Sequence, residues 1–171
     1  MVADPRWLSG AEYRAWIGYR RMRARLDLQL ARDLARDTGL SESDYDVLST
    51  VSEAQERRMR ISELADAMLW SKSRASHQIT RMQRRGLVMR EDCPEDGRGS
   101  AVVLTRAGWQ AIKTAAPRHV ASVREHFIDL LTSDQIDALA AIAQEVLSHL
   151  AEAGAGQPGW PQHAQPETGG S

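Results

Sequence analysis

The sequence predicts a mainly α-helical chain with one small β-hairpin, which is an α+β fold class. Two short helical patterns follow each other within residues 61–86, and two strand patterns follow within residues 87–104. Long amphipathic patterns stand on either side of this stretch. Two short helices followed by a hairpin is the order of a winged helix-turn-helix, so we expect that architecture, flanked by N- and C-terminal dimerisation helices.

The first short helix is indicated by the apolar residues of the stretch Ile61–Leu69. Ile61, Leu64, Ala65 and Met68 recur at steps of three and four residues, which places them on one face of a helix. The face is narrow, so this helix must pack against others.

The second short helix begins after Ser71, whose hydroxyl can accept hydrogen bonds from the first free backbone amides. Ala75, Ile79 and Met82 form its buried stripe. Gly86 ends it, because glycine adopts the left-handed conformation that closes a helix without a steric penalty.

The opposite face of this second helix carries only hydroxyls, a histidine and cations. No acidic residue occurs from Ser71 to Arg90, whereas an ordinary solvated helix face mixes charges of both signs. A helix that enters the major groove of duplex DNA needs short hydroxyls for close approach and longer cations for base edges and phosphates. We therefore expect DNA-binding residues here rather than a merely solvated face: Ser71, Lys72, Ser73, Arg74, Ser76, His77, Arg81 and Arg84.

The predicted hairpin joins a strand at Leu87–Glu91 to a returning strand at Ala101–Leu104. Its tip contains the turn-forming dipeptide Asp96-Gly97, followed by Arg98. An arginine at such a tip can reach the minor groove, where the negative potential is deepest. In isolation these residues would be typical of a solvated surface hairpin, but beside the helix pair they indicate DNA contacts by Asp96, Gly97 and Arg98.

The same residues carry a resemblance to a known family. The sequences SKSRASH at Ser71–His77, RRGLV at Arg84–Val88, DGRG at Asp96–Gly99 and LTRAG at Leu104–Gly108 resemble the multiple-antibiotic-resistance regulator (MarR) family. The resemblance implies a dimeric winged-helix transcription factor, commonly a repressor that a small aromatic or phenolic ligand releases from DNA. It also implies that Ser71–His77 lies in the major groove and the loop Asp96–Arg98 in the minor groove.

One residue departs from the usual pattern of helix-turn-helix sequences. Leu69 stands at a turn position where glycine, or another residue that tolerates left-handed geometry, is common. The geometry of this turn is therefore left open by the sequence.

The composition sets bounds on the function. A chain of 171 residues that is 42% hydrophobic and 26% charged fits one globular domain, and its net charge of −1 hides a local excess of basic residues at 20–25 and 71–90. No apolar run approaches the length of a membrane span and no signal-peptide pattern precedes the domain, so we expect a cytoplasmic protein without membrane contact. No catalytic motif, metal-ligand spacing or phosphate-binding loop is present, so neither an enzyme nor a cofactor is expected.

The flanking segments predict the domain organisation. We expect an N-terminal dimerisation helix at 1–40, the winged helix-turn-helix at 41–106, C-terminal dimerisation helices at 107–152 and a disordered tail at 153–171. Ser41 with Asp44, and Thr132 with Gln135, are helix-start signals. Pro117 predicts a kink or break in the first helix after the wing.

The terminal helices have more apolar surface than so small a domain can cover. A two-fold homodimer would cover it and would set two DNA-reading helices roughly 34 Å apart, which predicts a pseudo-palindromic site on double-stranded DNA. Aromatic and cationic residues of these helices could hold an aromatic acid or phenol, although each could equally serve the dimer core or the solvated surface: Tyr13, Trp16, Tyr19, Arg20, Arg23, His119 and Arg124.

Two alternatives stay open at the level of sequence. One is an architectural DNA-binding protein that has no ligand and little sequence preference. The other is a repressor that senses oxidants through Cys93, the only cysteine, although its acidic sequence neighbours would raise the pKa of a thiol.

Overall fold

The computed structural model describes residues 5–93 and 99–153. The described chain is mostly helical, with one small antiparallel sheet. The α-helices are α1 (Gly10–Thr38), α2 (Glu42–Glu53), α3 (Ile61–Ala67), α4 (Lys72–Arg84), α5 (Arg106–His126) and α6 (Ser133–Ala153). The strands are β1 (Arg58–Arg60), β2 (Val88–Cys93) and β3 (Gly99–Leu104), and two short 3-10 turns, η1 (Gln55–Arg57) and η3 (Ile128–Leu130), complete the order.

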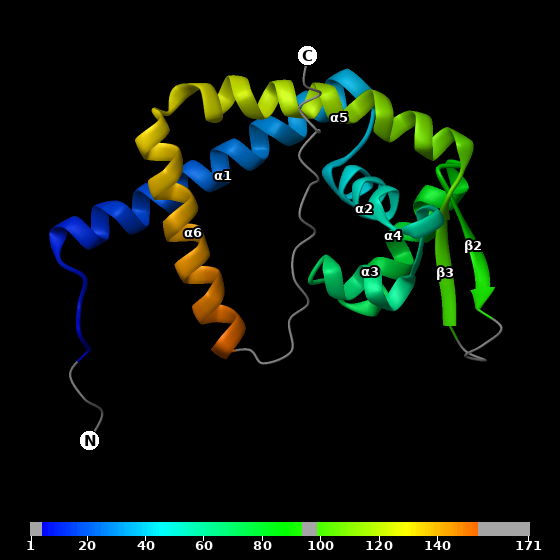
Figure 1. Cartoon of the computed structure of the whole chain (residues 1–171), viewed down its shortest axis with the longest axis horizontal. Helices are drawn as coiled ribbons and strands as arrows, with labels where there is room; N and C mark the ends of the chain where they lie inside the picture. Colours follow the sequence, from blue (N-terminus) through cyan, green and yellow to red (C-terminus); the bar gives the residue numbers. More distant parts are fainter. Residues whose placement is uncertain (1–4, 94–98, 154–171) are drawn as a thin grey trace, which may run out of the picture.

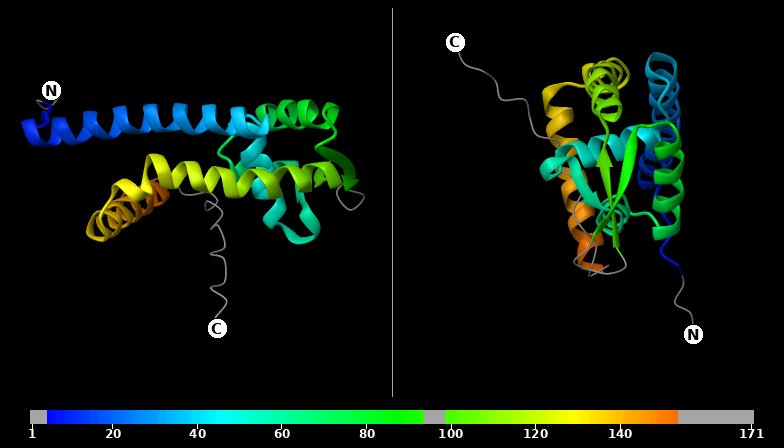
Figure 2. Two further views of the ribbon diagram at one scale, coloured as in Figure 1. Left: turned by 90° about the horizontal axis from the view of Figure 1, so that it is seen from above. Right: turned by 90° about the vertical axis from the view of Figure 1, so that its right-hand side faces the viewer.

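The molecule divides into a lobe and two helical arms, α1 and α6. Helices α2, α3 and α4 and the sheet gather into the lobe, α1 and α5 run alongside each other across it, and α6 turns away at the far end (Figure 1). Seen from above, α1 and α5 extend well beyond the lobe (Figure 2). This is the winged helix-turn-helix with flanking helices that the sequence predicts. None of the described helices is both long and apolar enough to cross a membrane.

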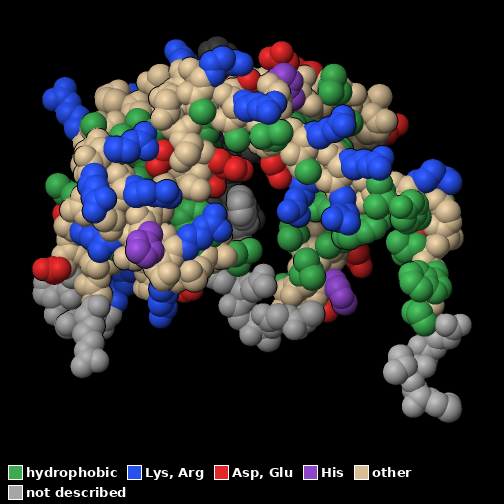
Figure 3. Space-filling model, turned by 180° about the vertical axis from the view of Figure 1, so that it is seen from behind, with side chains coloured by type: hydrophobic (Ala, Val, Ile, Leu, Met, Phe, Trp, Pro, Cys, Tyr) green, Lys and Arg blue, Asp and Glu red, His purple; other side chains and the backbone are tan. Residues whose placement is uncertain are grey.

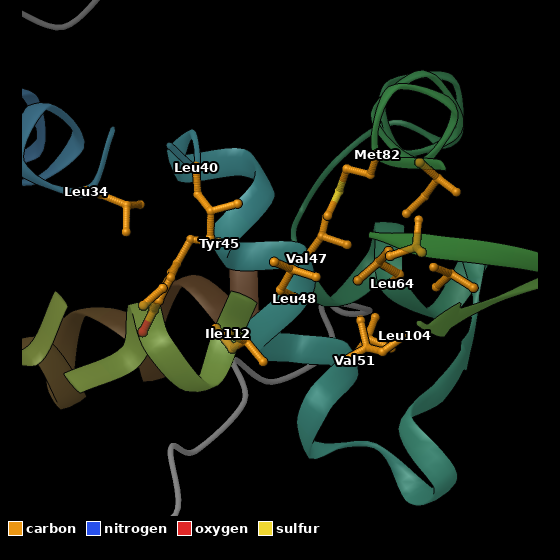
Figure 4. Packing of buried hydrophobic residues seen from close by; sticks show 14 residues of the cluster. Leu34, Leu40, Tyr45, Val47, Leu48, Val51, Leu64, Met82, Leu104 and Ile112 are labelled. Atoms are coloured by element: carbon orange, nitrogen blue, oxygen red, sulfur yellow. The ribbon is translucent and has the colours of Figure 1, made fainter. Parts of the chain in front are cut away.

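The core lies inside the lobe, with α2 at its centre (Figure 4). Leu48 of α2, Leu64 of α3 and Met82 of α4 are completely buried. Leu104 of β3 and Ile112 of α5 close the same cluster from the other side. Each short helix thus buries the narrow apolar face that its sequence pattern provides, and none could do so alone.

The sheet has one more strand than the hairpin. β3 lies between β2 and β1, with Val88 opposite Leu104 and Arg60 opposite Ala101. The short strand β1, immediately before α3, therefore anchors the hairpin to the helix-turn-helix.

The predicted helix starts are confirmed. The Ser41 hydroxyl accepts from the Asp44 amide at 3.2 Å, and the Asp44 carboxylate accepts from the Ser41 amide at 3.0 Å. Thr132 and Gln135 form the equivalent pair at the start of α6.

The two turns around α4 both use left-handed backbone. Gly86 has φ +72°, as the sequence predicts for the residue that ends α4. Leu69 has φ +53° in the turn between α3 and α4, so this turn, which the sequence left open, is left-handed although the residue is leucine. The amide of Trp70 donates to the Ala65 carbonyl at 2.8 Å and closes this turn.

The expected break at Pro117 is wrong. α5 is continuous from Arg106 to His126 with Pro117 inside it. Pro117 and Lys113, whose carbonyl loses the usual hydrogen bond, are both exposed, so solvent can satisfy that carbonyl. Ala115 and Ser122 are buried on the other side and hold the helix against the lobe and α1.

A buried carboxylate joins α1 to α5. One oxygen of Asp33 accepts from the Ser122 hydroxyl at 2.9 Å and lies 2.8 Å from Nε2 of His126, and the other accepts from Gln29 and Arg36. The hydrogen bond from Ser122 is the largest cause that lowers the pKa of Asp33, to about 2, and it acts against the burial that would raise it. The carboxylate therefore stays charged and fixes the two helices together.

Candidate nucleic-acid interface

Helix α4 presents its polar face to solvent. The Ser71 hydroxyl accepts from the Arg74 amide at 3.2 Å and starts the helix, while Ala75, Ile79 and Met82 point into the core. Most of the predicted DNA-binding residues are exposed on the opposite face: Ser71, Lys72, Ser73, Arg74, His77, Arg81 and Arg84. Cationic side chains, with a histidine among them, gather over this part of the lobe when the molecule is seen from behind (Figure 3).

Arg74 is held in place by an aromatic ring. Its guanidinium carbon lies 4.2 Å from the centroid of the Trp70 ring, in a cation–π contact just before the first turn of α4. The contact limits the orientations of the guanidinium and keeps it at the N-terminal end of the helix, which is the end that contacts base edges in helix-turn-helix proteins.

Ser76 lies differently from the other predicted residues. It is half-buried, and its carbonyl and hydroxyl accept hydrogen bonds from Arg90 of β2 at 2.7 and 3.0 Å. The same guanidinium donates to the Thr80 hydroxyl at 3.1 Å. Arg90 thus ties the wing strand to α4, and sequence patterns contain no signal for such a long-range pair.

A second polar link fixes the other side of α4. The buried amide of Gln78 donates to Asp44 at 2.8 Å, Arg85 donates to the same carboxylate at 2.5 Å, and Arg81 donates to the Gln78 side chain. Burial alone would raise the pKa of Asp44, but the hydrogen bonds from Arg85 and Ser41 outweigh it and lower the pKa. Asp44 therefore both starts α2 and orients α4.

A cleft of about 430 Å³ separates α4 from the sheet. Its cationic lining residues are Arg60, Lys72 and Arg90, its hydroxyls come from Ser62, Ser76 and Ser100, and no acidic residue lines it. Such a cleft suits the phosphates of a nucleic-acid backbone. The tip residues Asp96, Gly97 and Arg98 lie outside the described residues, so their contacts remain a prediction.

The residues expected around a ligand fall into separate places. On α1 the Trp16 and Tyr19 rings stack with centroids 6.1 Å apart, and Arg20 lies 5.8 Å from the Trp16 ring. The neighbouring Tyr19 is the largest cause that raises the pKa of Arg23. Tyr13, on the same helix, is also exposed. His119 instead packs on Tyr45 with ring centroids 4.5 Å apart.

Arg124, the last of these residues, pairs with Asp129 at 2.5 Å. In the single chain the α1 residues therefore form an exposed patch rather than an enclosed pocket.

Within residues 5–93 and 99–153, no three His, Cys, Asp or Glu side chains come together as a metal site would require.

Comparison with known proteins identifies the family. Residues 38–99 match the model of the MarR family, and no curated protein sequence matches the chain. The crystal structure of AbsC, a MarR family transcriptional regulator from Streptomyces coelicolor, is 43% identical, with a TM-score of 0.82 over 86% of this chain and 99% of that one. Sco3205, from the same organism and of the same family, was solved in complex with DNA; it is 37% identical, with a TM-score of 0.84 over 92% of this chain and 98% of that one.

The fold extends to more distant regulators. The organohalide-sensing RdhR-CbdbA1625 transcriptional regulator, in its 2,4-dichlorophenol-bound form, has a TM-score of 0.79 over 97% of this chain and 98% of that one, at 12% identity. The identity, coverage and fold shared with the two Streptomyces proteins, together with the exposed cationic face of α4, settle the assignment: the chain belongs to the MarR family and is a DNA-binding transcriptional regulator, not an enzyme.

Proposed function

We propose that this regulator is a cytoplasmic homodimeric repressor that binds a pseudo-palindromic operator and is released by a small aromatic or phenolic ligand. The observation that carries the proposal is the exposed, acid-free face of α4 beside the cationic cleft at the sheet. In this proposal α4 reads bases with Ser73, Arg74 and His77, and Lys72 and Arg84 bind phosphates.

Reading of bases can be tested with two arginine variants. We expect Arg74→Ala to relax sequence preference, because this guanidinium is held at the N-terminal end of α4. Arg84→Ala, at the other end, should weaken binding to all sequences alike. The measurement is selection of bound sites from a randomised duplex library, followed by titration of the enriched and the random duplexes. Equal loss on both duplexes for both variants would favour the architectural alternative.

The dimer is supported by apolar surface that the single chain leaves exposed. On α6, Ile142, Val146, Leu147 and Leu150 are each at least half exposed. So much contiguous apolar surface on a helix is typical of an oligomer interface. Leu147→Gln combined with Leu150→Gln should yield monomers by analytical ultracentrifugation at micromolar concentration, whereas Ser148→Gln on the same helix should stay dimeric. A monomeric wild-type chain would contradict the dimer.

The effector is supported by the aromatic and cationic patch on α1. Stacked Trp16 and Tyr19 offer apolar walls, and Arg20 and Arg23 offer partners for a carboxylate or phenolate. The ligand-bound regulator of the same fold is consistent with this class of ligand. A panel of phenols and aromatic acids should raise the melting temperature and release the operator, and repression should appear in a reporter fused to a bound site. If no compound does either, the effector proposal is wrong.

A further inference from the structure

A row of arginines on α1 takes no part in the site described above. Arg14, Arg21, Arg25 and Arg32 are separated by seven, four and seven residues. At about 100° per residue this spacing keeps all four within an arc of about 40° on one face of the helix. We call these four residues the α1 stripe. At about 1.5 Å per residue it is roughly 27 Å long.

The α1 stripe is exposed and carries uncompensated positive charge. All four side chains are exposed, and within the part of the chain that the structure describes none has a hydrogen bond or ion pair. The other arginines of the same helix behave differently: Arg20 lies near the Trp16 ring, Arg23 pairs with Asp27 at 3.7 Å and Arg36 pairs with Asp33. A solvated helix surface ordinarily balances its charges at i,i+4, and the α1 stripe does not.

The α1 stripe continues the cationic surface of α4. Arg85, just after α4, donates to the carbonyl of Gly39 at 3.2 Å, so the end of α1 lies against the end of α4. A hollow between the ends of the two helices has Arg81 and Arg85 in its lining, together with Asp44 of α2, which pairs with Arg85. From behind, a row of cationic side chains runs along α1 on the same face of the molecule as the cluster over α4 (Figure 3). α1 leads away from the lobe on the side opposite to the sheet (Figure 1).

The occupant that fits this surface is duplex DNA. A duplex carries one negative charge for about every 1.7 Å of its axis, so an acid-free row of cations roughly 27 Å long is complementary to it. A second copy of the chain is a poor occupant, because a two-fold contact would set arginines against arginines. The aromatic patch of Trp16 and Tyr19, which the effector proposal uses, lies elsewhere around the helix.

We infer that the α1 stripe is a second, sequence-independent contact surface for the bound duplex, on the side of α4 away from the wing. The inference rests on the proposed function, since α4 must first place the duplex. α4 and the wing would then set the sequence that is bound, while the α1 stripe adds affinity that depends strongly on salt.

The test compares two double variants of the full-length protein that each remove two positive charges from an exposed helix surface. Arg21→Gln with Arg25→Gln neutralises the centre of the α1 stripe, and Arg106→Gln with Lys113→Gln on α5, where both side chains are also exposed, is the matched control. Glutamine preserves helix propensity. Fluorescence anisotropy with a random-sequence duplex of about 40 base pairs gives the salt dependence of binding without knowledge of the operator.

We expect the slope of log binding constant against log salt concentration to become smaller for the stripe variant only. Two lost phosphate contacts per protomer reduce the slope by about 2 per protomer and weaken binding on the order of tenfold near 0.15 M salt. Equal slopes for the two variants would overturn the inference. A stripe variant that loses the oligomeric state of the wild type would also overturn it. A stripe variant that no longer binds phosphatidylserine vesicles but keeps its DNA binding would overturn it as well. A wild-type protein that fails to bind any duplex would instead overturn the proposed function.

Discussion

The lobe and the arms of this regulator use their apolar residues in opposite ways. In the lobe, Leu48, Leu64 and Ile79 have no exposed surface. On α6, Leu147 is 61% exposed and Ile142 is 62% exposed. The lobe thus owes its stability to contacts within one chain, whereas α6 leaves large apolar side chains exposed, which the proposed dimer would cover. Stability and assembly should respond to different substitutions.

The largest effect that separates the two regions is expected from the core. Leu48→Ala removes a completely buried side chain at the centre of the lobe and should lower the free energy of unfolding by about 3 kcal/mol. Urea denaturation followed by circular dichroism measures it. The loss should not depend on protein concentration, whereas the loss caused by Leu147→Ala on α6 should grow with protein concentration, because this side chain stabilises only the dimer. Similar, concentration-independent losses for both variants would remove the distinction between lobe and arm.

The junction between the lobe and α5 should show the next largest effect. A Cβ at Gly108 would lie 2.0 Å from the Leu87 carbonyl oxygen, so Gly108→Ala must push the backbone of α5 away from the turn after α4. We expect a loss of about 2 kcal/mol. Gly18→Ala in α1, where a Cβ meets nothing within 4 Å, is the control and should stabilise the chain through helix propensity. Thermal denaturation of the two variants tests the contrast.

The attachment of arm α1 to α5 should depend on pH. The pKa of Asp33 is about 2 in the folded chain and 3.8 without its partners, so on acidification the unfolded chain takes up this proton first. The stability that Asp33 contributes is therefore complete above about pH 4 and is lost as the pH falls towards 2. Asp33→Asn should flatten this part of the curve of stability against pH, whereas Asp134→Asn on α6 should leave it in place. An unchanged slope in Asp33→Asn would show that the carboxylate is not what joins α1 to α5 under acid conditions.

The smallest effect is expected in the turn before α4. Leu69 is 61% exposed and left-handed, so its side chain gains little from packing while its backbone is strained. Leu69→Gly should stabilise the chain by up to about 1 kcal/mol, and Leu69→Ala, which keeps the strain, should change it little. Differential scanning calorimetry can detect the difference. A destabilised Leu69→Gly would show that the leucine side chain, not the strain, determines this turn.

The sequence predicted those features of the fold that depend on interactions between residues close together in the chain. The starts of α2 and α6 and the end of α4 are set within a few residues, by Ser41 with Asp44, by Thr132 with Gln135 and by Gly86, and all were predictable. The break predicted at Pro117 was wrong, because proline disrupts a helix locally whereas burial of the opposite side keeps α5 continuous.

The candidate site shows the same limit. The exposed face of α4 follows from helical periodicity, so its residues could be chosen from the sequence. The links from Arg90 to Ser76 and from Arg85 to Asp44 join residues 14 and 41 positions apart, and no periodic pattern indicates such pairs.

The single guanidinium of Arg90 also limits how this regulator can change its specificity. Because it donates to Ser76 and Thr80 from β2, this guanidinium holds α4 and the strand together. In the proposed complex with DNA, a mutation that tilts the strand should therefore also shift α4 on the bases. New operators should be reached through exposed side chains such as Ser73 and His77, while the angle between helix and wing stays fixed.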